Sequence, residues 1–216
     1  MREERVRIRS GEILLEGLLS DQEALRVRGG VILCHPHPQY GGDMHNPVIT
    51  AASEAAFQEG FSTLRFNFRG VGESEGSYGE GIGEREDVQA VIDFWGSKWK
   101  GSPPLLVLLG YSFGAWAGLP VGVADKRIRG LVAIAPPLEL YDFGFLQRCE
   151  KPKLMIAGSQ DPFCPTSVLE AWFGHLEEPK SLAVVPGADH FFFSHTRSLD
   201  QPIREFLKNM GLGSKA

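Results

Sequence analysis

The stretch Leu105-Leu106-Val107-Leu108-Leu109-Gly110-Tyr111-Ser112-Phe113-Gly114-Ala115-Trp116 determines the fold. Five apolar residues lead directly into the pattern Gly-x-Ser-x-Gly, and a segment compatible with a helix follows. A short continuous apolar run between prolines and a glycine is typical of a fully buried strand. Gly110 and Gly114 leave room for a tight turn in which the backbone passes close to itself. The pattern predicts that the Ser112 hydroxyl stands above a sheet, at the N-terminus of a helix.

The length and composition indicate a globular protein with one domain over residues 1–216. The chain is 43% hydrophobic and 23% charged, which is typical of a domain with a sizeable core. Its net charge of −5 and the lack of a basic block argue against a nucleic-acid partner. No apolar run reaches the length of a membrane span, and no signal core follows Met1–Arg5. We therefore expect a cytoplasmic protein without a membrane partner, and the sequence leaves its oligomeric state open.

The rest of the chain alternates between apolar runs typical of strands and segments with helical spacing. Strands are predicted at 6–9, 12–19, 31–34, 62–68, 105–109, 131–135, 154–157 and 182–185. Helices are predicted at 47–59, 83–95, 113–123, 168–175 and 199–210. Repeated strand–helix alternation predicts an α/β fold with a mostly parallel, doubly wound sheet of about eight strands and helices on both faces. The short connection 136–152 leaves no room for a cap domain, so the site is expected to be open.

Two polar residues downstream of Ser112 have the properties of its catalytic partners. A serine hydroxyl is a weak nucleophile, which needs a general base and a carboxylate that orients the base. Asp161 follows the apolar run 153–158, and His190 follows the run 181–186. Because the carboxyl ends of parallel strands share one edge of a sheet, Ser112, Asp161 and His190 are predicted to meet there. The alternatives are a turn serine, a loop acid and a structural histidine; Asp189 is expected to be a bystander.

Five segments resemble motifs of the α/β-hydrolase superfamily. They are 34–42, 64–74, 110–114, 158–165 and 187–192. The chain is most similar to small lidless bacterial serine hydrolases related to dienelactone hydrolases, over roughly residues 3–210. The resemblance implies the α/β-hydrolase fold, a triad of Ser112, Asp161 and His190 in that chain order, and no cofactor.

The resemblance also implies a carboxylesterase that cleaves short-chain esters, with a small-molecule ester as its partner. Thioester or lactone hydrolysis would use the same residues, and a peptidase or a non-catalytic binding protein on this fold are further alternatives. The oxyanion hole is expected to use the backbone N–H of Phe113 and a second donor from the loop 35–42. His37 is the first choice for that donor, ahead of Tyr40 and Gly41. The superfamily often has His-Gly where this chain has His35-Pro36, which leaves the second donor open.

The same histidine-rich loop also permits a metal hypothesis. His35, His37, Asp43 and His45 are residue types that bind zinc. Their spacing is poor for a metal site, and the alternative is that His35 stabilises the loop by packing and hydrogen bonding. We therefore predict no metal.

Several aromatic residues and cysteines lie near the motifs. Tyr40, Phe143, Phe145, Phe163 and Phe191 are expected to rim the open site as an apolar acyl or alcohol pocket. An odd number of cysteines without framework spacing predicts reduced thiols, and Cys34 and Cys164 are expected to be small buried side chains. The third cysteine is Cys149.

Overall fold

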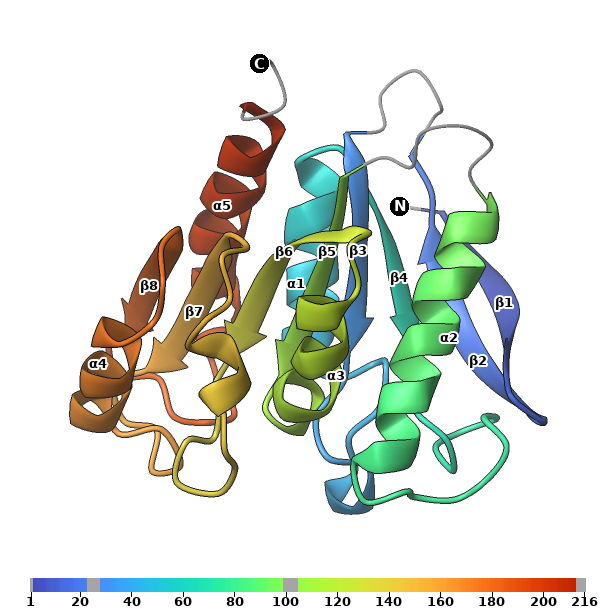
Figure 1. The fold of residues 1–216 in the computed structure, drawn as a ribbon, viewed down its shortest axis with the longest axis horizontal. Helices are drawn as coiled ribbons and strands as arrows, with labels where there is room; N and C mark the ends of the chain where they lie inside the picture. The colour runs from blue at the N-terminus through green and yellow to red at the C-terminus, as the bar shows by residue number, and fades with distance from the viewer. Residues whose placement is uncertain (1, 23–27, 99–104, 213–216) are drawn as a thin grey trace.

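Eight strands form one mixed sheet in the computed structural model, which describes residues 2–22, 28–98 and 105–212 (Figure 1). The strands are β1 (Glu3–Ser10), β2 (Ile13–Ser20), β3 (Gly29–Cys34), β4 (Phe61–Phe66), β5 (Leu105–Tyr111), β6 (Ile128–Ile134), β7 (Lys153–Gly158) and β8 (Lys180–Val185). The helices are α1 (Pro47–Gln58), α2 (Ile82–Lys98), α3 (Phe113–Ala124), α4 (Thr166–Gly174) and α5 (Asp200–Leu212). The predicted alternation of strands and helices is confirmed.

The strand order across the sheet is β1-β2-β4-β3-β5-β6-β7-β8. The pairs β1–β2 and β2–β4 are antiparallel, and every other neighbouring pair is parallel. Every residue of β3, β4 and β7 is buried. Burial on both faces is why β3 and β7 appear in the sequence as nearly continuous apolar runs, whereas β4 also buries the polar residues Ser62, Thr63 and Arg65. The prediction of a mostly parallel sheet is therefore confirmed.

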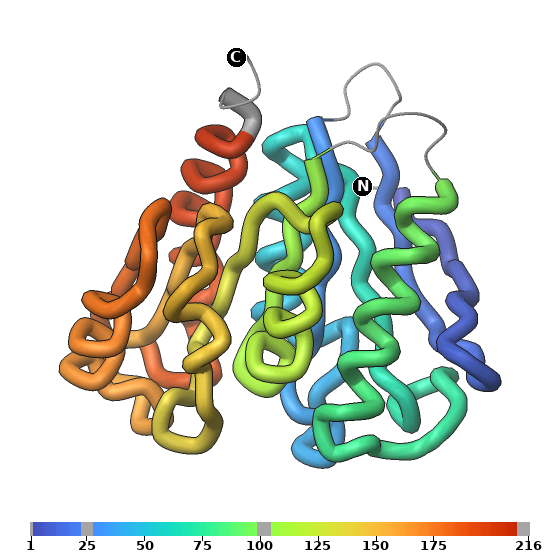
Figure 2. The backbone as a smooth tube through the Cα atoms, viewed as in Figure 1, coloured from blue at the N-terminus to red at the C-terminus, as the bar shows by residue number. Residues whose placement is uncertain are grey.

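Helices cover both faces of the sheet. α2, α3 and α4 lie on one face, whereas α1 and α5 lie side by side on the other (Figures 1 and 2). The two larger core clusters follow this division, with α2 and α3 contributing to one and α1 and α5 to the other, and a third, small cluster lies under α4. The sheet is thus doubly wound, as its strand–helix alternation predicts.

Helix α1 illustrates how local signals set the element boundaries. Asn46 precedes the helix, and its side chain accepts a hydrogen bond from the N–H of Val48, which satisfies one of the free donors of the first turn. Pro47 occupies a first-turn position that needs no N–H donor. Gly60 ends the segment with a φ of 84°, a conformation that glycine adopts without steric cost.

The connection between β6 and β7 contains a short 3-10 helix, Gly144–Leu146, and no cap domain. The loops that follow β3 to β8 therefore form an uncovered edge, seen at the bottom of Figure 1. Within the described ranges, none of the helices combines the length and the apolar character needed to cross a membrane.

A hollow of about 1370 Å³ lies at the opposite edge of the sheet. Its lining includes the first residues of β6, β7 and β8, together with part of α5, such as Phe206. Ser112, Asp161 and His190 do not line it. The predicted site therefore belongs to the other, open edge.

Candidate active site

Ser112 occupies the sharp turn between β5 and α3. Its φ of 52° and ψ of −118° are unusual for a residue with a side chain. The turn is held because the Ser112 N–H donates to the carbonyl of Ile134 at 2.9 Å. A Cβ at Gly110 would overlap the backbone of Ala115, and one at Gly114 would overlap the carbonyl oxygen of Cys34. Both glycines are thus required by close backbone approach, and the hydroxyl of Ser112 is held at the helix N-terminus.

Ser112, His190 and Asp161 form one hydrogen-bonded chain. Ser112 Oγ lies 2.9 Å from His190 Nε2, and His190 Nδ1 lies 2.8 Å from Asp161 Oδ2. The side chains of His190 and Asp161 are buried. The second carboxylate oxygen, Oδ1, accepts from the N–H groups of Phe163 and Cys164 at 2.8 and 3.1 Å. These two donors fix the carboxylate so that Oδ2 faces the imidazole.

The loops that carry Asp161 and His190 are bonded to each other. The Gln160 N–H donates to the carbonyl of Ala188 at 2.9 Å, and the Gly187 N–H donates to Ser159 Oγ at 2.8 Å. Consequently the distance between the carboxylate and the imidazole is set by backbone contacts as well as by their own hydrogen bond.

Tyr111 is a neighbour of His190 that the sequence reasoning missed. Its Oη donates to the carbonyl oxygen of His190 at 3.0 Å from a buried position. Burial, with a smaller contribution from Asp161, raises the pKa of Tyr111, so the phenol keeps its proton. The available signal was its place directly before the nucleophile, at the end of β5.

Asp189 does not contact the His190 ring. Its Oδ1 accepts instead from the N–H groups of Phe191 and Phe193, at 3.1 and 3.3 Å. This carboxylate therefore shapes the loop after His190, while the position beside the imidazole belongs to Asp161.

The N–H groups of the loop after β3 differ in their availability. Those of Tyr40 and Gly42 donate to the His37 carbonyl, and that of Gly41 donates to Pro38. By contrast, no described residue accepts a hydrogen bond from the N–H of His37 or from the N–H of Phe113. The rings of His37 and Phe113 lie 4.6 Å apart, which brings the loop against the start of α3. Two free backbone donors thus lie close to the turn that carries Ser112.

His35 has a structural environment. Its Nε2 accepts from the Phe68 N–H at 3.0 Å, so the proton lies on Nδ1, which donates to the Pro36 carbonyl at 2.6 Å. Burial lowers the pKa of His35 to about 4, which keeps the ring neutral. Across residues 2–22, 28–98 and 105–212, no group of three or more His, Cys, Asp or Glu is arranged to hold a metal.

The three cysteines are free and buried, and burial was predicted for Cys34 and Cys164. Burial raises the pKa of Cys34, and it raises that of Cys164 to about 12. A protonated, buried thiol is a small apolar side chain rather than a nucleophile.

Two of the predicted aromatic residues flank the imidazole. The Phe163 and Phe191 rings lie 4.9 and 5.5 Å from that of His190, both edge-on. Tyr40 lies on the other side of the site, 4.7 Å from the ring of His37.

The prediction that Phe143 rims the site is wrong. Its side chain is only 2% exposed and packs in the core against Phe145 and Trp172. Phe143 directly precedes the 3-10 helix Gly144–Leu146, in a connection with no regular period that would reveal which side chains are buried. Phe145 is half-buried and packs on the same ring.

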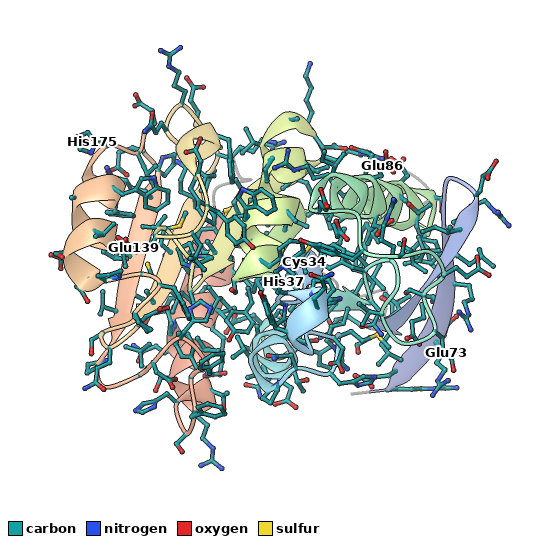
Figure 3. All side chains as sticks on the ribbon, turned by 90° about the horizontal axis from the view of Figure 1, so that it is seen from below. Cys34, His37, Glu73, Glu86, Glu139 and His175 are labelled. Carbon is teal, nitrogen blue, oxygen red and sulfur yellow. The ribbon has the colours of Figure 1, made fainter. Side chains whose placement is uncertain are left out.

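Three further aromatic residues were missed. The Trp116 and Tyr141 rings stack at 4.4 Å, and Trp116 lies 5.7 Å from Phe113. Tyr78 Oη lies 3.2 Å from His37 Nε2. Tyr78 and Tyr141 belong to the loops after β4 and β6, so the rule that places these loops at one edge could have identified them. Figure 3 looks onto this edge, with His37 near its centre.

Comparisons with known proteins identify the family and the fold. A family model described as an alpha/beta hydrolase domain matches residues 29–210. An uncharacterised protein of Rickettsia prowazekii is 33% identical over 184 residues, which are 82% of this chain and 77% of that protein. An α/β serine hydrolase homologue from Coxiella burnetii is 33% identical, with a TM-score of 0.86 over 97% of this chain and 98% of that one. A lidless α/β serine hydrolase from Xanthomonas campestris is 30% identical, with a TM-score of 0.83 over 97% and 95% of the two chains.

Proposed function

The chain belongs to the α/β-hydrolase family, and we propose that it is a serine hydrolase that cleaves short-chain carboxylic esters through an acyl-enzyme. The observation that carries the proposal is the hydrogen-bonded chain from Ser112 Oγ through His190 to Asp161 Oδ2. A nucleophile, a base and an orienting acid in this order are the parts that acyl transfer requires.

Acylation starts when the ester carbonyl lies beside Ser112. Oγ attacks the carbonyl carbon while its proton passes to His190 Nε2, and Asp161 stabilises the resulting imidazolium. The negative charge that develops on the carbonyl oxygen is held by the N–H groups of Phe113 and His37, which have no acceptor within the described protein. When the intermediate collapses, the C–O bond to the alcohol breaks, and His190 gives its proton to the leaving oxygen.

Deacylation repeats these steps with water. His190 Nε2 takes a proton from the water as its oxygen attacks the acyl carbon. The proton then returns to Ser112 Oγ as the bond between serine and acyl group breaks, which releases the acid. All the groups in this scheme are side chains and backbone amides of the chain, so the proposed reaction uses no cofactor.

The surroundings of Ser112 favour a small acyl group. The connection after β6 carries no cap that would enclose a long chain. Phe163 and Phe191 beside the imidazole, and Tyr40 beside His37, offer apolar surface for the acyl or alcohol group.

The test measures the turnover of 4-nitrophenyl acetate by the wild-type protein and by Ser112→Ala. Ser77→Ala is the matched control, since it makes the same change at an exposed serine. We expect Ser112→Ala to fold normally and to lose about 10⁴–10⁶-fold in turnover, because the triad acts as a unit. Ser77→Ala should match wild type, and a fluorophosphonate should label Ser112 alone. A folded Ser112→Ala protein with near wild-type turnover would contradict the serine-hydrolase proposal. A panel of esters, thioesters and lactones then separates the substrate classes.

A further inference from the structure

The exposed large apolar side chains of the described residues all lie at one edge of the molecule. They are Tyr40 (87% exposed), Ile82 (70%), Leu140 (59%), Phe191 (53%) and Phe193 (72%). Each lies in, or at the end of, a loop that follows the carboxyl end of a strand: β3, β4, β6 or β8. We call these five residues the apolar rim.

Ring contacts connect the rim to both neighbours of the Ser112 hydroxyl, the His190 ring and the start of α3. On one side, Phe193 contacts Phe191 at 5.6 Å, and Phe191 contacts the ring of His190. On the other side, Tyr40 packs on His37, whose ring reaches Phe113.

The remaining two rim residues, Ile82 and Leu140, are connected to the site through their sequence neighbours, which contact the Trp116 ring. This ring lies next to Phe113 and stacks on Tyr141, the neighbour of Leu140. It also lies against Gly81, the neighbour of Ile82. All five rim residues are thus connected, directly or through a sequence neighbour, to rings that contact His190 or Phe113, beside Ser112.

The loop after β8 is built to expose two phenylalanines. Phe192 has a φ of 53° and Ser194 a φ of 62°, a region that side-chain-bearing residues avoid. This backbone buries Phe192 completely and directs Phe191 and Phe193 to solvent. Asp189 Oδ1 holds the arrangement through the N–H groups of Phe191 and Phe193. Strained backbone of this kind persists where the surrounding structure holds it, and it clusters at functional sites.

The charges around the rim are mostly negative. Within three sequence positions of a rim residue, the acids that reach solvent are Asp43, Glu80, Glu139, Asp142 and Asp189, and the only arginine or lysine is Arg85. Glu84 is also in this range, but it is buried. The Arg85 guanidinium lies over the Trp116 ring, at 5.3 Å. Glu139 lies to one side of His37 in Figure 3. A partner with a negative surface would be repelled here, whereas an uncharged one would not.

We propose that the apolar rim docks the protein on the surface of aggregated, uncharged ester, such as a droplet or micelle, with Ser112 facing it. An exposed apolar ring bordered by polar residues marks a site of contact with another apolar surface. The absence of a cap lets a flat surface reach the serine, and the rim residues insert around the point of reaction. This inference rests on the proposed esterase function and adds the physical state of the substrate.

The experiment compares a dissolved and an emulsified short-chain ester. We expect the wild-type rate on tributyrin to rise sharply once its concentration exceeds the solubility limit. Phe193→Ser should lower the emulsion rate about tenfold, since one partly inserted phenyl ring is lost, while turnover of dissolved 4-nitrophenyl acetate stays within about twofold. Phe193→Leu, which keeps an apolar side chain, is the matched control and should retain most of the emulsion rate.

A second measurement does not depend on turnover. Ser112→Ala protein is centrifuged with the tributyrin emulsion, and its partition into the droplet layer is compared with that of the double variant Ser112→Ala/Phe193→Ser. We expect the double variant to partition about tenfold less. Droplets carrying an anionic surfactant should bind the Ser112→Ala protein less than neutral droplets do.

The outcomes separate this inference from the proposed function. If 4-nitrophenyl acetate is turned over but tributyrin shows no rise above its solubility limit, the docking inference is overturned and the esterase proposal stands. If neither ester is turned over, the esterase proposal fails, and the partition assay decides on the rim by itself. If sedimentation shows a dimer that Phe193→Ser dissociates, a second copy covers the rim and the inference is wrong.

Discussion

Replacing Asp161 with asparagine tests how the carboxylate acts, because its two oxygens have different partners. Oδ1 accepts from two backbone N–H groups, and Oδ2 accepts from His190 Nδ1. In Asp161→Asn the carbonyl oxygen has to stay on the Oδ1 side, since the reverse orientation would aim NH₂ at two N–H donors. The NH₂ group then faces His190 Nδ1, which must become an acceptor, and the imidazole proton moves to Nε2.

With its proton on Nε2, His190 donates to Ser112 Oγ and is unable to accept the serine proton. The base is lost while the fold is retained. The corresponding substitution in a serine protease triad lowers kcat by about 10⁴, which is about 5 kcal/mol of transition-state stabilisation. We expect a loss of this order in kcat/KM for 4-nitrophenyl acetate, with an unchanged far-UV circular dichroism spectrum.

Asp189→Asn is the matched control for this measurement. The amide oxygen of the new side chain retains the acceptor for the Phe191 and Phe193 N–H groups, and no bond to His190 is involved. The cost should therefore stay near that of weakening two hydrogen bonds, less than about tenfold in rate. Similar losses in both variants, or a folded Asp161→Asn protein with full activity, would refute the assignment of Asp161.

Three other perturbations have definite expected results. His37→Ala keeps the backbone N–H and should cost only a small factor in kcat, whereas His37→Pro removes it and should cost about 10²-fold; circular dichroism checks the fold of both. Burial lowers the pKa of His35 from 6.5 to about 4, so between these values the unfolded chain holds a proton that the folded protein lacks. The free energy of unfolding should fall by about 3 kcal/mol as the pH drops through this window. Urea titrations measure that fall, and His35→Asn should remove most of it. Ester turnover should be unchanged in excess EDTA, and a loss that added zinc restores would contradict the mechanism proposed for His37 and Phe113.

The positions of Ser112, Asp161 and His190 were predictable because two simple rules apply to them. Buried parallel strands appear in the sequence as continuous apolar runs, and residues that follow such strands meet at one edge of the sheet. Neither rule depends on side-chain packing, so the sequence suffices. The structure places the three side chains within hydrogen-bond distance in the predicted order, and their catalytic roles stay a prediction until they are tested.

The start of β3 was predicted two residues too late for a physical reason. Gly29 and Gly30 belong to the strand, although glycine weakens strands and usually marks their ends. A Cβ at Gly29 would overlap the carbonyl oxygen of Leu105, and one at Gly30 would overlap the ring of Trp95. The glycines are present because other elements pack closely on this strand, which is tertiary information.

The aromatic lining of the site was less predictable than the triad. Phe143 and Tyr141 are two residues apart in the same connection, yet Phe143 is in the core and Tyr141 stacks on Trp116 near the nucleophile. A short irregular connection has no hydrophobic period that tells inside from outside. The sequence therefore identifies which loops reach the site, but not the direction of each side chain within them.

Strained backbone conformations occur at only one of the two edges of the sheet within the described residues. The non-glycine residues with positive φ in the described ranges are Glu80, Ser112, Ala135, Phe192 and Ser194. All of them lie after the carboxyl ends of β4, β5, β6 or β8. Each such conformation is disfavoured by about 1–3 kcal/mol, so it persists only where tertiary contacts hold it. At Ser112 those contacts direct the hydroxyl toward His190. At Phe192 they expose the neighbouring rings of Phe191 and Phe193, and the Phe191 ring lies beside His190. Residues with disfavoured backbone conformations are thus found at the edge that carries both the hydrogen-bonded chain and the apolar rim. For this reason we propose a function for that edge and none for the hollow at the opposite edge.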